Sequence, residues 1–114
     1  MATGEEVIPV RFNLLGHAIT VEFVDDLYYT HDVVGMAMYR QDKILLQRST
    51  AQFPLTKEAQ EHSFFHEMMH FLLYYGGEDQ FEPDLHKREY LVDRLSGLLH
   101  QALTTAIYDQ RGER

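Results

Sequence analysis

The strongest constraint on the fold is an apolar run, residues 63–75, that also carries ionisable side chains. As an α-helix it would be apolar almost all round, which is typical of a helix buried within a domain. It nevertheless contains His66, Glu67 and His70 in the order His-Glu-Met-Met-His. Histidines four residues apart lie on one face of a helix. Burying such groups is costly unless a partner satisfies them, so the run predicts a central helix with a polar site.

A metal ion would be a suitable partner for these side chains. Two imidazoles at this spacing can bind one zinc ion, and the intervening glutamate can act on a zinc-bound water. His62, one turn before His66, adds a third imidazole to the same face. A short pattern with three fixed positions also arises by chance, and the seven histidines of the chain raise that chance. A chance HExxH in an α+β interaction module without metal therefore stays as an alternative.

Length and composition restrict the class of protein to which the chain can belong. The 114 residues predict a single domain over residues 1–114. Because the chain has no cysteine, disulfides and thiolate zinc sites are excluded, and a metal would need His, Asp or Glu. The net charge of −8 argues against a nucleic-acid partner, since that affinity depends on clustered Lys and Arg. No run is long enough to cross a bilayer and residues 1–6 lack signal-peptide features, so we expect a cytoplasmic protein with no membrane partner.

The first part of the chain predicts a small β-sheet within residues 7–48. Residues 7–15 and 18–24 indicate a hairpin that turns at Gly16 and His17. The second strand alternates apolar and polar side chains, as half-buried strands do. Residues 25–32 are polar and turn-like.

A second strand pair is expected at residues 34–39 and 43–48. Its apolar side is assigned to Met36, Met38, Ile44, Leu45 and Leu46. The expected fold class is α+β: a mostly antiparallel sheet of three to four strands, then the buried helix and a second long helix.

The boundaries of the central helix are marked by local signals. Pro54 ends the sheet region because proline cannot donate to a strand ladder. Thr56 suits an N-cap, and Gly76 with Gly77 is a common helix stop. The helix is expected over residues 56–76.

A second helix is expected over residues 85–110, after an acidic loop at 78–84 and before a charged tail at 109–114. Its apolar side chains recur at helical spacing: Leu91, Leu95, Leu98, Ala102 and Ala106, with Val92, Leu99 and Leu103 beside them.

This second helix offers a third metal ligand. A catalytic zinc site has three protein ligands and an open position for water. Glu89 and Asp93 lie one turn apart at the edge of the apolar stripe, so Glu89 could bind the metal while Asp93 accepts a hydrogen bond from a ligand histidine. Two alternatives stay open. Both acids could be surface groups paired with Arg88 or Arg94, or His86 could take the place of Glu89.

The order His66-Glu67-x-x-His70, then Glu89-x-x-x-Asp93 in a second helix, resembles the gluzincin metallopeptidases. The small size is most similar to the minimal ImmA/IrrE-like peptidases and the short HExxH proteins of phages and prophages. The resemblance implies one zinc ion held by the two histidines and Glu89, with Glu67 as general base. It also implies that Asp93 supports the ligands from the second shell.

The resemblance covers about residues 55–101, and the sheet before it matches only in the order of its elements. The aromatic helix is a departure from the family, and the chain has no room for the extra domains that shape a cleft in longer members. The metzincin pattern does not fit, because it requires Gly and His where this chain has Leu73 and Gly76.

These residues predict a zinc-dependent metallopeptidase, of bacterial or phage origin, that cleaves a protein or peptide substrate. Glu67 would pass a proton from water to the leaving amine. The substrate would lie extended along the edge formed by residues 34–48. The sequence does not choose among the candidates for a second oxyanion donor: Tyr74, Tyr75, Tyr90, His86 and His100.

Two further points stay open at this stage. A catalytically silent, zinc-stabilised binding or regulatory protein of phage type would carry the same ligands. Imidazole and carboxylate ligands also suit divalent ions other than zinc.

Overall fold

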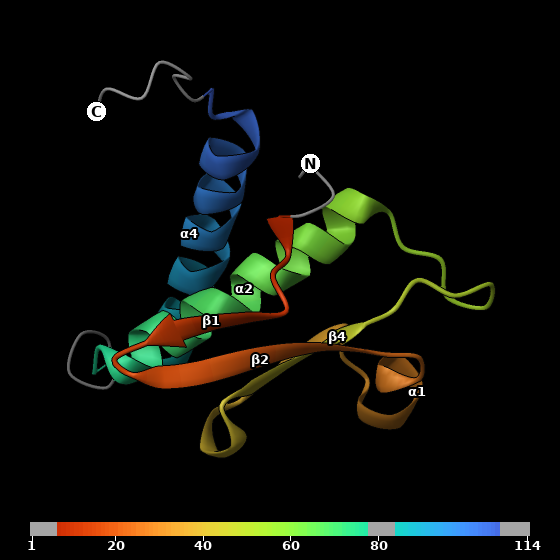
Figure 1. The fold of residues 1–114 in the computed structure, drawn as a ribbon, viewed down its shortest axis with the longest axis horizontal. Helices are drawn as coiled ribbons and strands as arrows, with labels where there is room; N and C mark the ends of the chain where they lie inside the picture. Colours follow the sequence, from red (N-terminus) through yellow and green to blue (C-terminus); the bar gives the residue numbers. More distant parts are fainter. Residues whose placement is uncertain (1–6, 78–83, 108–114) are drawn as a thin grey trace.

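A computed structural model describes residues 7–77 and 84–107 of the chain. The fold is α+β, as expected, with a four-stranded sheet followed by two long helices (Figure 1). The expectations for residues 1–6, for the tail at 109–114, and for the acidic loop apart from Asp84, lie outside the described residues.

The first two strands form the expected antiparallel hairpin. β1 (Arg11–Leu14) pairs with β2 (His17–Val24), and Leu14 lies opposite His17. The turn consists of Leu15 and Gly16, both at positive φ (49° and 80°), so it falls one residue earlier than expected. Two-residue turns of this kind match the twist of the flanking strands.

The second strand pair is also antiparallel. β3 (Gly35–Met38) and β4 (Lys43–Gln47) are joined by the short 3₁₀ helix η2 (Tyr39–Gln41). β4 pairs with β2 in parallel, so the sheet order is β1-β2-β4-β3 and the sheet is mixed. β2 and β4 thereby occupy the centre, and β1 and β3 lie at the edges.

The register assigns the side chains of the sheet to two faces. Ile44 and Leu46 are fully buried, and their partners in β3 are Ala37 and Gly35, which share their face. Met36 and Met38 alternate with these residues and therefore lie on the opposite face. The expectation that the two methionines share an apolar side with Ile44 and Leu46 is wrong, because small residues of β3 face the helix instead.

Residues 25–32 contain a short helix, α1 (Leu27–His31), where only a polar turn was expected. Leu27 is buried, which gives the segment an anchor in the core. Asp32 caps the helix in the left-handed conformation, with φ of 60°. α1 lies beside the end of β4.

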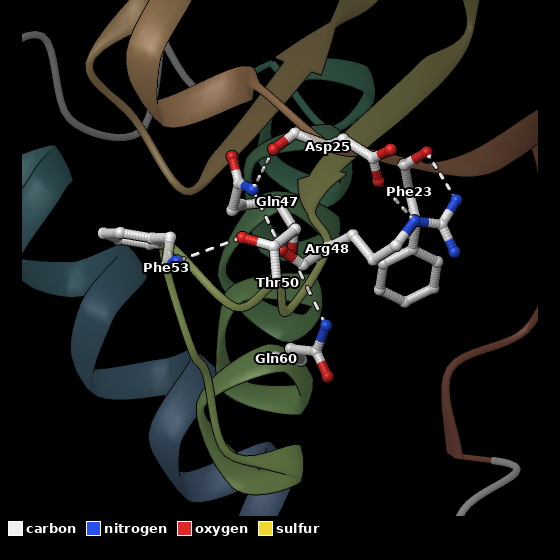
Figure 2. A network of polar contacts seen from close by, with 7 residues as sticks. All are labelled: Phe23, Asp25, Gln47, Arg48, Thr50, Phe53 and Gln60. Carbon is white, nitrogen blue, oxygen red and sulfur yellow. Dashed lines mark hydrogen bonds and ion pairs between the residues drawn. The ribbon is translucent and has the colours of Figure 1, made fainter.

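Gln47, the last residue of β4, holds this region together. Its side chain is buried; Oε1 accepts the N–H of Tyr28 (2.7 Å), while Nε2 donates to the carbonyls of Asp25 (2.7 Å) and Arg48 (2.9 Å). Figure 2 shows Gln47 beside Asp25, whose carboxylate accepts from Nε of Arg48 at 2.8 Å. The amide therefore binds one backbone group in α1, one just before it and one directly after β4.

α2 (Lys57–Tyr75) has the expected start and end. The hydroxyl of Thr56 accepts the N–H of Ala59 at 3.0 Å, which caps the helix, and Gly76 is its C-cap. α2 crosses one face of the sheet (Figure 1). The core forms between them, from Ile19, Ile44, Leu46, Phe64, Phe65 and Phe71.

α4 (Leu85–Thr105) packs on α2 and ends five residues before the expected residue 110. The hydroxyls of Thr104 and Thr105 donate to the carbonyls of His100 and Gln101, and two consecutive β-branched residues are weak helix formers. The C-terminal part of α4 points away from the sheet in Figure 1. Neither this nor any other helix in the described part of the chain is long and apolar enough to cross a membrane.

The face that α4 turns toward α2 differs from the expected stripe. Val92 and Ser96 are fully buried, whereas Leu91 and Leu98 are 37 % and 58 % exposed. The small side chain of Ser96 lets the two helices approach closely. α4 therefore turns the face with Ser96 toward α2, and this face lies beside its leucine-rich face.

Replacing Gln47 by Met should destabilise the fold by about 2–4 kcal/mol, because the part-buried backbone groups of Asp25, Tyr28 and Arg48 would lose their partner. The free energy of unfolding in urea measures this. Gln41→Met is the control, since Gln41 is exposed on η2. Equal stability of the two variants would contradict the anchoring role of Gln47.

Candidate metal centre

α2 presents its site residues on the side away from the core. At about 100° per residue, His66 and His70 lie within about 40° of each other on the helix, opposite the buried phenylalanines. Their side chains are 22 % and 19 % exposed, and their ring centroids are 5.0 Å apart. Both rings face α4.

α4 places Glu89 directly opposite these rings. Nε2 of His66 is 3.0 Å from Oε1 of Glu89, and Nε2 of His70 is 3.3 Å from Oε2. One donor atom from each of the three residues lies within 4.8 Å of the others. Tetrahedral ligands about 2.0–2.1 Å from a zinc ion are themselves about 3.3 Å apart, so the spacing fits a metal ion. The group His66, His70 and Glu89 could hold one ion.

Asp93 lies next to this group but outside it. Its Oδ1 is 3.6 Å from Nδ1 of His66, on the opposite side of the imidazole from Glu89. A carboxylate in this position can orient a ligand histidine through its second ring nitrogen. Arg94, which could have paired with Asp93 in the same helix, donates instead to the hydroxyl of Tyr90 at 2.7 Å.

The competing ligand, His86, does not belong to the described group of donor atoms. It lies in the first turn of α4 and is exposed. The helix instead brings Glu89, almost one turn later, against α2.

Glu67 points away from α4, toward β3. It is 9 % exposed. Burial raises the pKa of Glu67 to about 7; the positive charge of His66 opposes the rise, Glu89 adds to it, and a hydrogen bond from the backbone N–H of Ala37 opposes it. A carboxyl group with a pKa near neutrality can both accept and release a proton at physiological pH.

Gly35 allows this position of Glu67. A Cβ atom at residue 35 would lie 2.9 Å from Oε2 of Glu67 and 3.1 Å from its Cγ. Such distances require a shift of the carboxylate. The bare backbone of β3 therefore forms the wall against which Glu67 packs.

Most of the candidates for a second oxyanion donor are engaged elsewhere. Nε2 of His100 is 2.9 Å from the buried Glu61, and the hydroxyl of Tyr75 donates to Asp42 at 2.5 Å. Tyr90 accepts from Arg94, and Tyr74 stacks on Tyr39. None of them lines the cleft next to Glu67, whereas His62 does.

This cleft has a volume of about 450 Å³ and opens beside the metal-binding group. We call it the α1–β3 cleft. α2 forms one wall, the end of α1 with the start of β3 forms the other, and α4 adds one acid. Its lining residues are Tyr28, Asp32, Val33, Val34, Gly35, His62, Ser63, His66, Glu67 and Asp93.

A second polar contact fixes α4 on α2. Glu61 is 4 % exposed and pairs with His100 across the two helices. Between this pair and the metal-binding group, Ser96 is buried and Gly97 lies next to His62. Polar contacts thus join the two helices on either side of the buried Ser96, and these contacts fix the position of Glu89.

Sequence reasoning missed several residues that shape the site. Gly35 carries a usable signal, because a glycine inside a strand often marks a close approach of another group. Gln47 and the pair of Glu61 with His100 carry none, because their partners are distant in the sequence.

Comparisons with protein families, with curated proteins and with solved structures find no match to this chain. The candidate site therefore rests on its own geometry.

Gly35→Ala should displace the Glu67 carboxylate and cost about 1–3 kcal/mol of stability, because the added methyl group overpacks the wall. The amide resonance of Ala37 in an NMR spectrum should shift as its hydrogen bond is lost. Gly97→Ala is the control: its Cβ would lie 3.9 Å from Nε2 of His62, which is an ordinary van der Waals contact, and alanine favours helices. An unchanged Ala37 resonance in Gly35→Ala would show that this contact does not position Glu67.

Proposed function

We propose that the chain is a zinc-dependent metallopeptidase, a minimal protein of the gluzincin type. The observation that supports this most is the convergence of His66, His70 and Glu89 at metal-ligand spacing, with the buried Glu67 beside them. Three ligands on two helices leave a fourth position open. Glu89 is 57 % exposed, so a substrate can approach from its side.

The residues of the site would have two roles, binding the metal and transferring a proton. His66, His70 and Glu89 would hold zinc, which when bound would lower the pKa of a coordinated water and polarise the substrate carbonyl. Glu67 would accept a proton from the attacking water and deliver it to the leaving amine, which completes hydrolysis of the peptide bond. The Ala37 N–H and the Gly35 backbone keep this carboxylate in place.

β3 is the element that would hold an extended substrate. The N–H of Gln47 donates to the carbonyl of Val34 at 2.9 Å, so residues 34, 36 and 38 direct their backbone groups to β4. The N–H and C=O groups of Gly35 and Ala37 then face the edge of the sheet. The hydrogen bond from Ala37 to Glu67 agrees with this direction. A peptide added as a further strand would meet the N–H and C=O of Gly35 and the C=O of Ala37, next to the general base.

Glu89→Ala should lose the metal, because only two protein ligands would remain. Asp93→Ala should weaken metal binding about 10- to 100-fold, as loss of an outer-shell partner does. Elemental analysis of protein purified in metal-free buffer measures this, and a chelator should lower the melting temperature of the wild type. His86→Ala is the control; loss of zinc in this variant but not in Glu89→Ala would exchange the two assignments.

Glu67→Gln should retain zinc and the fold but abolish cleavage, because the amide cannot accept the proton. Digestion of a peptide library by wild type and variant at equal zinc content, followed by mass spectrometry, measures this. Glu58→Gln, an exposed position in the first turn of α2, is the matched control. Cleavage that persists in Glu67→Gln excludes this mechanism. A zinc-loaded wild type that cleaves nothing favours the alternative, a zinc-stabilised binding or regulatory protein.

A further inference from the structure

The α1–β3 cleft has walls of two different kinds. Tyr28, Val33 and Val34 contribute mainly apolar surface, and Gly35 exposes backbone where it meets Glu67. From Asp32 to Gly35 the chain spans at most about 11 Å. The cleft thus extends from Glu67 to the C-terminal end of α1.

Apart from its two histidines, the ionisable side chains of the cleft are acidic. Asp32, Glu67 and Asp93 line it, together with two histidines, and no lysine or arginine among the described residues does so. Asp93 is close to His66, and Glu67 accepts from Ala37. The carboxylate of Asp32 is exposed and makes no hydrogen bond or ion pair with the described part of the chain. Asp32 is therefore the acid that is available to a ligand.

We propose that the α1–β3 cleft binds a lysine or arginine side chain of the substrate, at the residue next to the cleaved bond. The inference rests on the proposed function, because the substrate backbone must lie along β3. The aliphatic stem packs on Val33, Val34 and Tyr28, as long basic side chains do on apolar surfaces. The charged head reaches Asp32, and Asp93 adds to the negative potential. An acidic side chain is repelled by the same groups.

Asp32 can be tested without loss of the fold. It adopts the left-handed conformation at the C-cap of α1, which asparagine tolerates well. Asp32→Asn therefore removes the charge and keeps the cap. Asp26→Asn is the matched control at the other end of α1, where the aspartate is exposed and makes no side-chain capping bond.

The experiment measures peptide binding and not cleavage. The zinc-loaded Glu67→Gln chain is titrated with three labelled peptides that differ at one residue, which is lysine, norleucine or glutamate. Fluorescence anisotropy should show the lysine peptide binding about tenfold tighter than the norleucine peptide, and the glutamate peptide weakest. High salt should reduce the difference. Asp32→Asn should bring lysine close to norleucine, and Asp26→Asn should leave the preference unchanged.

Equal binding of the lysine and norleucine peptides overturns the proposal, as does equal loss of preference in Asp32→Asn and Asp26→Asn. Absence of binding by all three peptides overturns it too. The wild-type library digest separates this result from the proposed function. If the lysine peptide binds best but the wild type cleaves nothing, the cleft binds a basic side chain and the chain is not a peptidase. If the wild type cleaves peptides but the titration shows no preference for lysine, only the assignment of the cleft is wrong.

Discussion

The contact between Glu67 and the backbone of β3 is the constraint on which the site depends. A buried carboxyl group needs a wall that admits it and a donor that satisfies it. Gly35 provides the space, and the N–H of Ala37 provides the donor. Because both groups belong to an edge strand, the same contact aligns α2 with the open edge of the sheet. Small residues in β3 thus admit the Glu67 carboxylate, and Ala37 also packs against the core.

The position of Glu89, the candidate third ligand, depends on a different contact, the packing of α4 on α2. Glu89 reaches His66 and His70 only because α4 turns the face with Val92 and Ser96 toward α2. A rotation of α4 by one residue, about 100°, would move Glu89 away from the two histidines. In this orientation, part of the leucine-rich face of α4 is exposed to solvent.

These contacts explain how much of the molecule the sequence predicts. The spacing of His66 and His70 and the ends of α2 are local properties, so a single chain segment carries their signal. The position of Glu89 follows from that spacing only after the resemblance to a family is added. The parallel pairing of β2 with β4 and the approach of Gly35 to Glu67 join distant segments. No local pattern encodes such pairings, so the parallel direction of β4 relative to β2 could not be predicted.

The core residues of α2 and its candidate metal ligands lie on opposite faces of the helix. Its buried phenylalanines, among them Phe64 and Phe71, pack on the sheet and would form the core whether or not a metal is present. The ligand face already has His66 and His70 at hydrogen-bonding distance from Glu89, so an ion would enter with little rearrangement of the helices. Preorganised donors of this kind lose little conformational entropy on binding. A metal would then replace contacts that the protein already makes, which keeps the geometry beside Glu67 the same with and without the ion.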